Sequence, residues 1–322
     1  MREAVAQDIF NRRKVTINPE EIVIVPGGKV TMWHAILMFG GKGKEIIYPN
    51  PGFPIYESVI NYSGSKPVPI KLDISNNFKL NFEALEKLIN QQTSLLIINF
   101  PSNPTGGIIS RKEMDELVFI LEKYPNVKVL SDEIYSRILY DKAQFISLLE
   151  YPQLKDRVII LDGWSKTYAM TGWRIGYGVW PKEYASIAEQ LNINSFSCTN
   201  TITQYAALEA LQGSQSSVDL MIDEFDKRRK IMVDQLNLIK GFECRSSGGA
   251  FYLFPSIKKT GLLSKDMENI LLNKIGIAAV SGTSFGRYGE GYIRFSYANS
   301  EENIRLALKK IKNYSEQVGW NA

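Results

Sequence analysis

Short runs of apolar and β-branched residues recur along the first half of the chain and alternate with stretches of helical spacing. The apolar runs lie at residues 21–25, 45–49, 94–100, 127–133 and 157–163. The intervening stretches 30–39, 81–90 and 111–124 repeat apolar residues at helical spacing. Nearly continuous apolar strands are typical of parallel sheets buried on both faces, so this alternation predicts an α/β fold with helices on both sides of the sheet.

A different pattern begins near residue 180. Residues 201–240 predict a long helical stretch that breaks near Gly213 into two helices. Short strands among helices are expected further on, at residues 248–255, 276–282 and 291–298, before a closing helix at 301–314. This pattern predicts a large domain at residues 1–216 and a smaller α+β domain at residues 217–322.

Composition excludes several classes of function. The chain of 322 residues is 44% hydrophobic and 22% charged, which is ordinary for a globular protein. A net charge of +4, from 38 basic and 34 acidic residues, argues against a nucleic-acid binder. Two cysteines and the single histidine His34 provide neither a disulfide framework nor a metal cluster. Without a bilayer-length apolar run or a signal peptide, we expect a cytoplasmic protein with no membrane partner.

The stretch GWSKTYAMTGWRIGYG at residues 163–178 carries two positive charges among aromatic and small residues. A partly buried lysine such as Lys166 loses proton affinity, and its neutral amine can attack a carbonyl to give a Schiff base. Arg174 keeps its charge and presents a rigid fork that suits phosphate. Together they indicate pyridoxal phosphate, whose aldehyde needs an amine and whose phosphate needs an anchor. For this stretch alone, a surface pair beside a glycine turn is an equal alternative.

Polar residues that follow the predicted strands extend this hypothesis, because ligands of open α/β sheets bind at the carboxyl ends of strands. Asp132, in SDEIY, could keep a pyridine nitrogen protonated, and Tyr135 could donate to the ring phenolate. Asn103, in NFPSNPTGG, sits in a turn that would hold its amide rigidly. A helix-capping carboxylate and an ordinary turn are the alternatives.

Three further motifs offer contacts for such a ligand. Gly28 lies where a strand meets a helix in VPGGKVTMWHAI, an arrangement that binds phosphate. Phe53, in the proline-rich loop YPNPGFPIYES, could stack on a flat ring. Arg294, in the middle of the predicted strand GYIRFSYA, could clamp a substrate carboxylate. Each motif has an alternative, which is a glycine turn, a packing aromatic or a structural ion pair.

In their order and spacing, these motifs resemble the class I/II aminotransferases, pyridoxal-phosphate enzymes of fold type I. The resemblance covers nearly the whole chain and looks closest to the branch of aspartate and prephenate aminotransferases. It implies a three-layer, doubly wound, mostly parallel sheet with a smaller C-terminal α+β domain. It also implies a homodimer that uses pyridoxal 5'-phosphate to move an amino group between an L-amino acid and a 2-oxo acid.

The resemblance also implies roles for individual residues. Lys166 would bond to the cofactor aldehyde and later carry the substrate proton, while Asp132 would pair with the pyridine nitrogen. The remaining cofactor contacts would be Tyr135 and Asn103 at the ring oxygen, Phe53 on the ring face, and Arg174, Ser165, Gly28 and Lys29 at the phosphate. Many relatives have tryptophan or tyrosine in place of Phe53.

Substrate contacts follow from the same resemblance. Arg294 would bind the α-carboxylate of the substrate beside Asn103. In the aspartate and prephenate branch, the lysine that matches Lys29 also reaches toward a distal carboxylate, which favours dicarboxylic substrates; a solvated lysine at a helix start is the alternative.

One departure concerns the start of the chain. Relatives have several dozen residues before the point that matches MREAVAQ, and these supply a lid and a tyrosine that reaches the partner subunit's phosphate. Two other functions stay open, the first because the chemistry of the cofactor also permits β-elimination and the second because of this departure. One is a pyridoxal-phosphate lyase or synthase on the same fold, and the other is a truncated cofactor-binding protein with little turnover.

Overall fold

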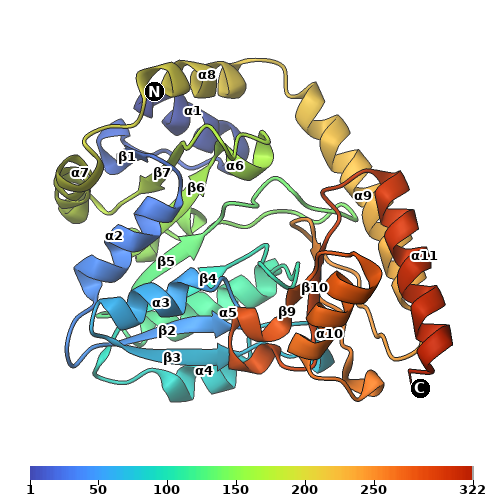
Figure 1. Cartoon of the computed structure of the whole chain (residues 1–322). Coiled ribbons are helices and arrows are strands. Elements are labelled where there is room, and N and C mark those ends of the chain that lie inside the picture. The colour runs from blue at the N-terminus through green and yellow to red at the C-terminus, as the bar shows by residue number, and fades with distance from the viewer. Residues whose placement is uncertain (321–322) are drawn as a thin grey trace.

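The computed structural model describes residues 1–320 and is built around a seven-stranded sheet of order β1-β7-β6-β5-β4-β2-β3 (Figure 1). The strands are β1 (Ile22–Val25), β2 (Glu45–Asn50), β3 (Lys66–Lys71), β4 (Thr93–Asn99), β5 (Lys128–Asp132), β6 (Val158–Gly163) and β7 (Gly176–Val179). Strands β3, β2, β4, β5 and β6 pair in parallel, whereas β7 runs antiparallel to both β1 and β6. The predicted fold class, a doubly wound and mostly parallel sheet, is confirmed.

Two strands of this sheet, β3 and β7, were not predicted from the apolar pattern. Strand β3 reads KPVPIK and lies at the edge, where proline is tolerated because one side of the strand has no ladder to complete. Strand β7 reads GYGV. A Cβ atom at Gly176 would lie 2.3 Å from the backbone nitrogen of Gly28, so close packing of β7 on the β1–α2 turn requires glycine there.

Helices cover both faces of the sheet and make three layers. One face carries α2 (Lys29–Phe39), α3 (Ile55–Tyr62) and α7 (Lys182–Phe196). The other carries α1 (Arg2–Arg13), α4 (Phe82–Leu88), α5 (Arg111–Glu122) and α8 (Thr201–Gln212).

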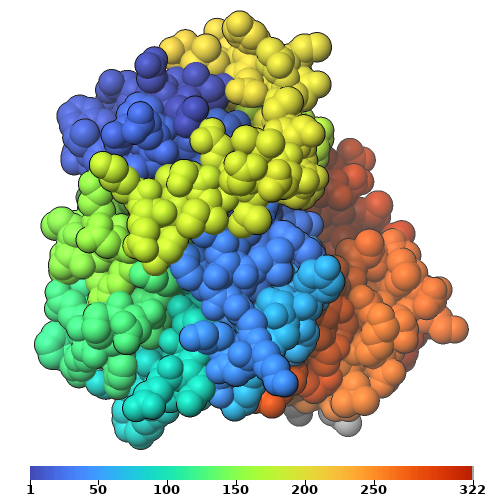
Figure 2. All heavy atoms as spheres, turned by 90° about the vertical axis from the view of Figure 1, so that its left-hand side faces the viewer, coloured from blue at the N-terminus to red at the C-terminus, as the bar shows by residue number. Residues whose placement is uncertain are grey.

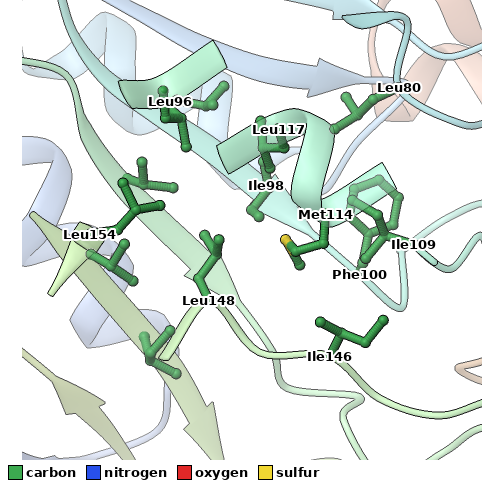
Figure 3. Packing of buried hydrophobic residues seen from close by; sticks show 14 of the residues in the cluster. Leu80, Leu96, Ile98, Phe100, Ile109, Met114, Leu117, Ile146, Leu148 and Leu154 are labelled. Carbon is green, nitrogen blue, oxygen red and sulfur yellow. The ribbon is translucent and has the colours of Figure 1, made fainter. Parts of the chain in front are cut away.

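Successive residues of a strand point to opposite faces of the sheet and therefore pack alternately against the two helical layers. Ile97 packs under the first helical layer and Ile98 under the second. Figure 3 shows the second layer, where Leu96 and Ile98 of β4 face Met114 and Leu117 of α5. Burial on both faces explains why these strands read as continuous apolar runs.

A smaller sheet of order β8-β10-β9 follows, with strands β8 (Tyr252–Leu253), β9 (Val280–Ser281) and β10 (Ile293–Ser296). It packs with α9 (Ser216–Leu236), α10 (Ser264–Ile270) and α11 (Glu301–Val318) around a separate apolar core. The predicted break near Gly213 is confirmed, since α8 ends at Gln212 and α9 begins at Ser216. This core also includes Ile138 and Tyr140, so the domain boundary between residues 216 and 217 stays a prediction.

The remaining elements are short. After β6 comes the single turn α6 (Trp164–Thr167), and a π-helical turn, Leu271–Ile275, continues α10. The 3-10 helices are Pro19–Glu21, Ile74–Asn76, Leu148–Glu150, Pro152–Leu154, Lys258–Thr260, Gly282–Phe285 and Arg287–Gly289. Within residues 1–320, no helix has both the length and the apolar character to cross a bilayer, and no three metal-ligating side chains gather into a candidate metal site.

Candidate active site

A cavity of about 490 Å³ opens where the carboxyl ends of the central strands face the smaller sheet. Every site residue predicted from the sequence lines it: Gly28, Lys29, Phe53, Asn103, Asp132, Tyr135, Ser165, Lys166, Arg174 and Arg294. The cavity size lies in the usual range for small-molecule sites. The chain therefore gathers into one place side chains that are up to 266 positions apart in the sequence (294 − 28).

Lys166 lies on α6, directly after β6, and is half-buried. Burial lowers the pKa of its ammonium group, and the positive charges of Arg294 and Arg174 lower it further. Its Nζ lies 5.6 Å from the ring centroid of Phe251, and it forms no salt bridge within residues 1–320. These surroundings favour the neutral, nucleophilic amine.

Asp132 ends β5 and is buried. The hydroxyl of Tyr56 donates a hydrogen bond of 2.6 Å to its Oδ2, and the backbone N–H of Ile134 donates to Oδ1 at 3.3 Å. Burial nevertheless raises its pKa to about 6, because these hydrogen bonds only partly offset the loss of water. In the described part of the chain no lysine or arginine pairs with this carboxylate, so a cationic group in the cavity would be stabilised beside it.

Another part of the cavity lining is suited to an anion. Gly28 caps the N-terminus of α2, and within residues 1–320 its N–H and that of Lys29 form no backbone hydrogen bond, whereas the N–H of Val30 donates to the carbonyl of Gly27. Arg174 lies beside this turn, held by a 2.8 Å hydrogen bond from its Nη1 to the carbonyl of Thr171. A Cβ atom at Gly27 would lie 2.1 Å from Nη2 of Arg174, so glycine permits this close approach. The buried Ser165 adds a hydroxyl to the same wall.

Arg294 projects from β10 between two aromatic rings. Its guanidinium carbon lies 4.6 Å from the ring centroid of Tyr252 and 4.8 Å from that of Phe285. Its Nη1 donates to Oδ1 of Asn103 at 3.1 Å, while its Nε is buried without a partner. No acid pairs with it within residues 1–320, so the alternative of a structural ion pair has no support among these contacts.

A hydrogen-bonded relay links the large sheet to this arginine. The amide of Asn99 donates to the backbone carbonyl of Asp132 at 3.0 Å, and its Oδ1 accepts from the backbone N–H of Asn103 at 2.9 Å. Because Arg294 occupies Oδ1 of Asn103, the amide nitrogen of Asn103 stays available as a donor. Asn103 is thus held at its backbone N–H by Asn99 and at its side-chain Oδ1 by Arg294.

Lys29 and Phe53 lie together at the cavity. Nζ of Lys29 is 5.7 Å from the centroid of the Phe53 ring, and Phe53 packs edge-on against Tyr56 at a centroid distance of 5.7 Å. Lys29 is exposed, in keeping with the alternative of a solvated lysine as well as with a contact to a distal group of a ligand.

The sequence interpretation missed two tyrosines of the site. Tyr56 lies on α3, three residues after Phe53, and Tyr252 lies on β8 inside the motif GGAFYLFP. The hydroxyls of Tyr252 and Tyr135 are 2.9 Å apart. From sequence alone, a tyrosine on an apolar helix face or strand is interpreted as a core residue. Only the hydrogen-bond partner, which is distant in the sequence, shows that its hydroxyl belongs to a polar site.

Comparison with protein families places the chain. The family model described as aminotransferase class I and II matches residues 1–311. The chain belongs to this family. It is 34% identical to the aspartate aminotransferase of Pyrococcus abyssi over 315 residues, which are 97% of this chain and 80% of that protein. It is 35% identical to the aspartate/prephenate aminotransferase of Nitrosomonas europaea, over 97% of this chain and 81% of that protein.

Solved structures agree with the fold. The aromatic aminotransferase from Pyrococcus horikoshii superimposes with a TM-score of 0.96 at 33% identity, over 99% of this chain and 86% of that chain. The aspartate aminotransferase from Rhizobium meliloti gives a TM-score of 0.93 at 32% identity, over 98% of this chain and 81% of that chain. This protein is therefore an enzyme of the class I and II aminotransferase family, which typically uses pyridoxal phosphate.

Proposed function

We propose that this aminotransferase uses pyridoxal 5'-phosphate to move an amino group between an L-amino acid of the aspartate or glutamate type and a 2-oxo acid. The observation that carries the proposal is one cavity that holds a lysine of lowered proton affinity, a buried carboxylate without a cationic partner and two arginines without acidic partners among the described residues. Aromatic amino acids and prephenate are the other substrates that the named relatives suggest.

The residues present match the cofactor in charge and in shape. Arg174, Ser165 and the first amides of α2 would hold the phosphate. Gly27 leaves room for Arg174 there, because a Cβ atom at that position would lie only 2.1 Å from its Nη2. Asp132 would pair with the ring nitrogen. The other contacts would be Asn103 and Tyr135 at the ring oxygen and Phe53 on the ring face.

The chain's own residues then have separate tasks. When bound, the cofactor supplies an aldehyde that takes up the amino group and a ring that spreads the charge left by removal of the Cα proton. Nζ of Lys166, whose pKa is lowered by burial and by the nearby charges of Arg294 and Arg174, would accept that proton and return it at the former aldehyde carbon of the cofactor. Asp132 holds a proton at the ring nitrogen, and its burial keeps competing water away.

Arg294 and Lys29 define how the substrate lies. Arg294 offers a guanidinium fork to the α-carboxylate, with the amide nitrogen of Asn103 beside it. Lys29, exposed over Phe53, would meet a second, distal carboxylate. The preference for dicarboxylic substrates rests on this lysine.

A spectral half-reaction tests the proposal. The protein is loaded with pyridoxal phosphate and mixed in turn with aspartate, glutamate, aromatic and branched amino acids. We expect the visible absorption to convert with aspartate and glutamate first, and borohydride to fix an adduct on Lys166. Lys166→Ala should abolish turnover.

Three results would count against the proposal. A protein that stays colourless with the cofactor would contradict cofactor binding at Lys166. A coloured protein that no amino donor converts would point to a binding protein with little turnover. Release of pyruvate and ammonia from cysteine-type substrates, without amino transfer, would point to a lyase.

We also infer that the chain forms a homodimer. Large apolar side chains are exposed on α7 and α8, namely Ile187, Ile193, Phe196, Ile202 and Tyr205. Figure 2 shows this face, with α7 crossing α2 and α8 above it. A face of this kind suits a protein interface. Sedimentation should give twice the chain mass, and Ile202→Asp should shift the mass toward the monomer, whereas the exposed Leu238→Asp on another element should not.

A further inference from the structure

Tyr252 contacts two of the groups that the proposed function uses, although its own position was not assigned a role. It is buried on β8, which pairs antiparallel with β10, so its side chain is a diagonal neighbour of Arg294 across the small sheet. Its hydroxyl lies 2.9 Å from the hydroxyl of Tyr135, and its ring lies 4.6 Å beneath the guanidinium of Arg294. One side chain thus joins a cofactor contact to a substrate contact.

The direction of the hydrogen bond follows from proton counting. Under the proposed function, Tyr135 gives its single hydroxyl proton to the ring oxygen of the cofactor. Its oxygen can then only accept from Tyr252, which must act as the donor. In a buried site, such a chain polarises the middle hydroxyl and makes it a stronger donor.

The ring of Tyr252 has a different effect. It holds the guanidinium of Arg294 by a cation–π contact at 4.6 Å, and the ring of Phe285 makes a second such contact at 4.8 Å. An acidic neighbour would hold the guanidinium equally well but would neutralise it. The aromatic contact fixes the fork and leaves its charge for a carboxylate.

We propose that Tyr252 is a positioning residue for both steps, strengthening Tyr135 through its hydroxyl and orienting Arg294 through its ring. The proposal rests on the proposed function. It predicts that the two roles separate in two variants of this one residue.

Tyr252→Phe removes only the hydroxyl. A weaker donor at Tyr135 leaves more negative charge on the ring oxygen, which favours protonation of the neighbouring Lys166 nitrogen. We expect the pH midpoint of the visible absorption of the cofactor-loaded protein to rise by about 0.5 to 1 pH unit. Binding of maleate, a dicarboxylate that cannot donate an amino group, should change less than about twofold because the ring remains.

Tyr252→Leu removes the ring as well. It should raise the absorption midpoint by a similar amount and also weaken maleate binding by about fivefold or more, measured by titration of the absorption. Tyr252→Met replaces it if the leucine variant does not fold. Tyr297→Phe is the matched control, since Tyr297 is a buried tyrosine of the same core whose hydroxyl contacts Ser247 and the carbonyl of Ala250, outside the cavity.

The outcomes separate this inference from the proposed function. A parent protein that takes up no cofactor at Lys166 defeats the proposed function itself. A parent with normal absorption, combined with an unchanged midpoint in Tyr252→Phe or the same shift in Tyr297→Phe, defeats the role of the hydroxyl. Equal maleate affinity in the phenylalanine and leucine variants defeats the role of the ring.

Discussion

At the scale of single residues, Asp132 shows a conflict between folding and chemistry. Its carboxyl is buried without a cationic partner among the described residues, and burial raises its pKa to about 6, against an ordinary value near 3.8. The folded protein therefore binds this proton more tightly than the unfolded chain does. The associated stabilisation is fully present below pH 4 and is lost as the pH rises through 6.

Asp132→Asn should remove this pH dependence from the cofactor-free protein. The asparagine cannot ionise, so the variant should gain about 2 kcal/mol of unfolding free energy relative to the parent between pH 4 and pH 7.5. Urea unfolding of both proteins at the two pH values measures the difference. A difference that stays constant with pH would show that the carboxyl is not destabilised by burial.

Tyr56→Phe should act on the same carboxyl by raising its pKa further. Loss of the 2.6 Å hydrogen bond removes a contact that favours the ionised form, so the pKa of Asp132 should rise further. The acid limb of cofactor affinity against pH should move upward by about 1 pH unit or more. Tyr62→Phe, at the exposed end of the same helix, serves as the control and should leave the limb in place.

At the scale of elements, the buried Arg13 joins α1 to the sheet through two ion pairs. Nη1 of Arg13 lies 2.8 Å from Oε2 of Glu133, and Nη2 lies 2.8 Å from Oδ2 of Asp162. Glu133 directly follows β5, and Asp162 lies near the end of β6, beside the site. The sequence analysis assigned no role to Arg13, because its partners lie more than 100 residues away along the chain.

Arg13→Met would leave Glu133 and Asp162 buried without their counter-ion. We expect a loss of about 3 to 5 kcal/mol of unfolding free energy, measured by urea denaturation near neutral pH. Arg2 lies on the same helix as Arg13 and forms an exposed ion pair with Glu189 of α7. Arg2→Met, which breaks this pair, should cost less than about 1 kcal/mol of unfolding free energy. Similar losses in both variants would contradict the special role of the buried pair.

At the scale of the whole molecule, the apolar pattern predicted those parts of the fold that are buried on two sides. Strands β2, β4, β5 and β6 were found because both of their faces pack under helices. Edge strand β3 and the glycine-rich β7 were not predicted, because proline and glycine are uncommon in strands and interrupt the apolar pattern. The position of each of these strands depends on the neighbouring strands instead.

The site shows the same division between local and distant information. Asp132, Lys166 and Asn103 were predicted because they lie at or within a few residues of the ends of strands, where chain connectivity alone brings them to one edge. Tyr56 and Tyr252 could not be, since their partners Asp132 and Tyr135 lie 76 and 117 residues away. Residue type and spacing give the first group, whereas the second depends on distances that only the folded chain supplies.

The hydrogen-bonded relay from Asp132 through Asn99 and Asn103 to Arg294 holds its two ends at a fixed separation. It fixes the distance between the proposed partner of the ring nitrogen, Asp132, and the proposed receptor of the α-carboxylate, Arg294. Every 2-amino acid has the same geometry over that span, whatever its side chain. Discrimination among amino donors must therefore depend on residues outside this relay, near Lys29 and Phe53. Substitution of those residues should change the substrate preference while amino transfer itself persists.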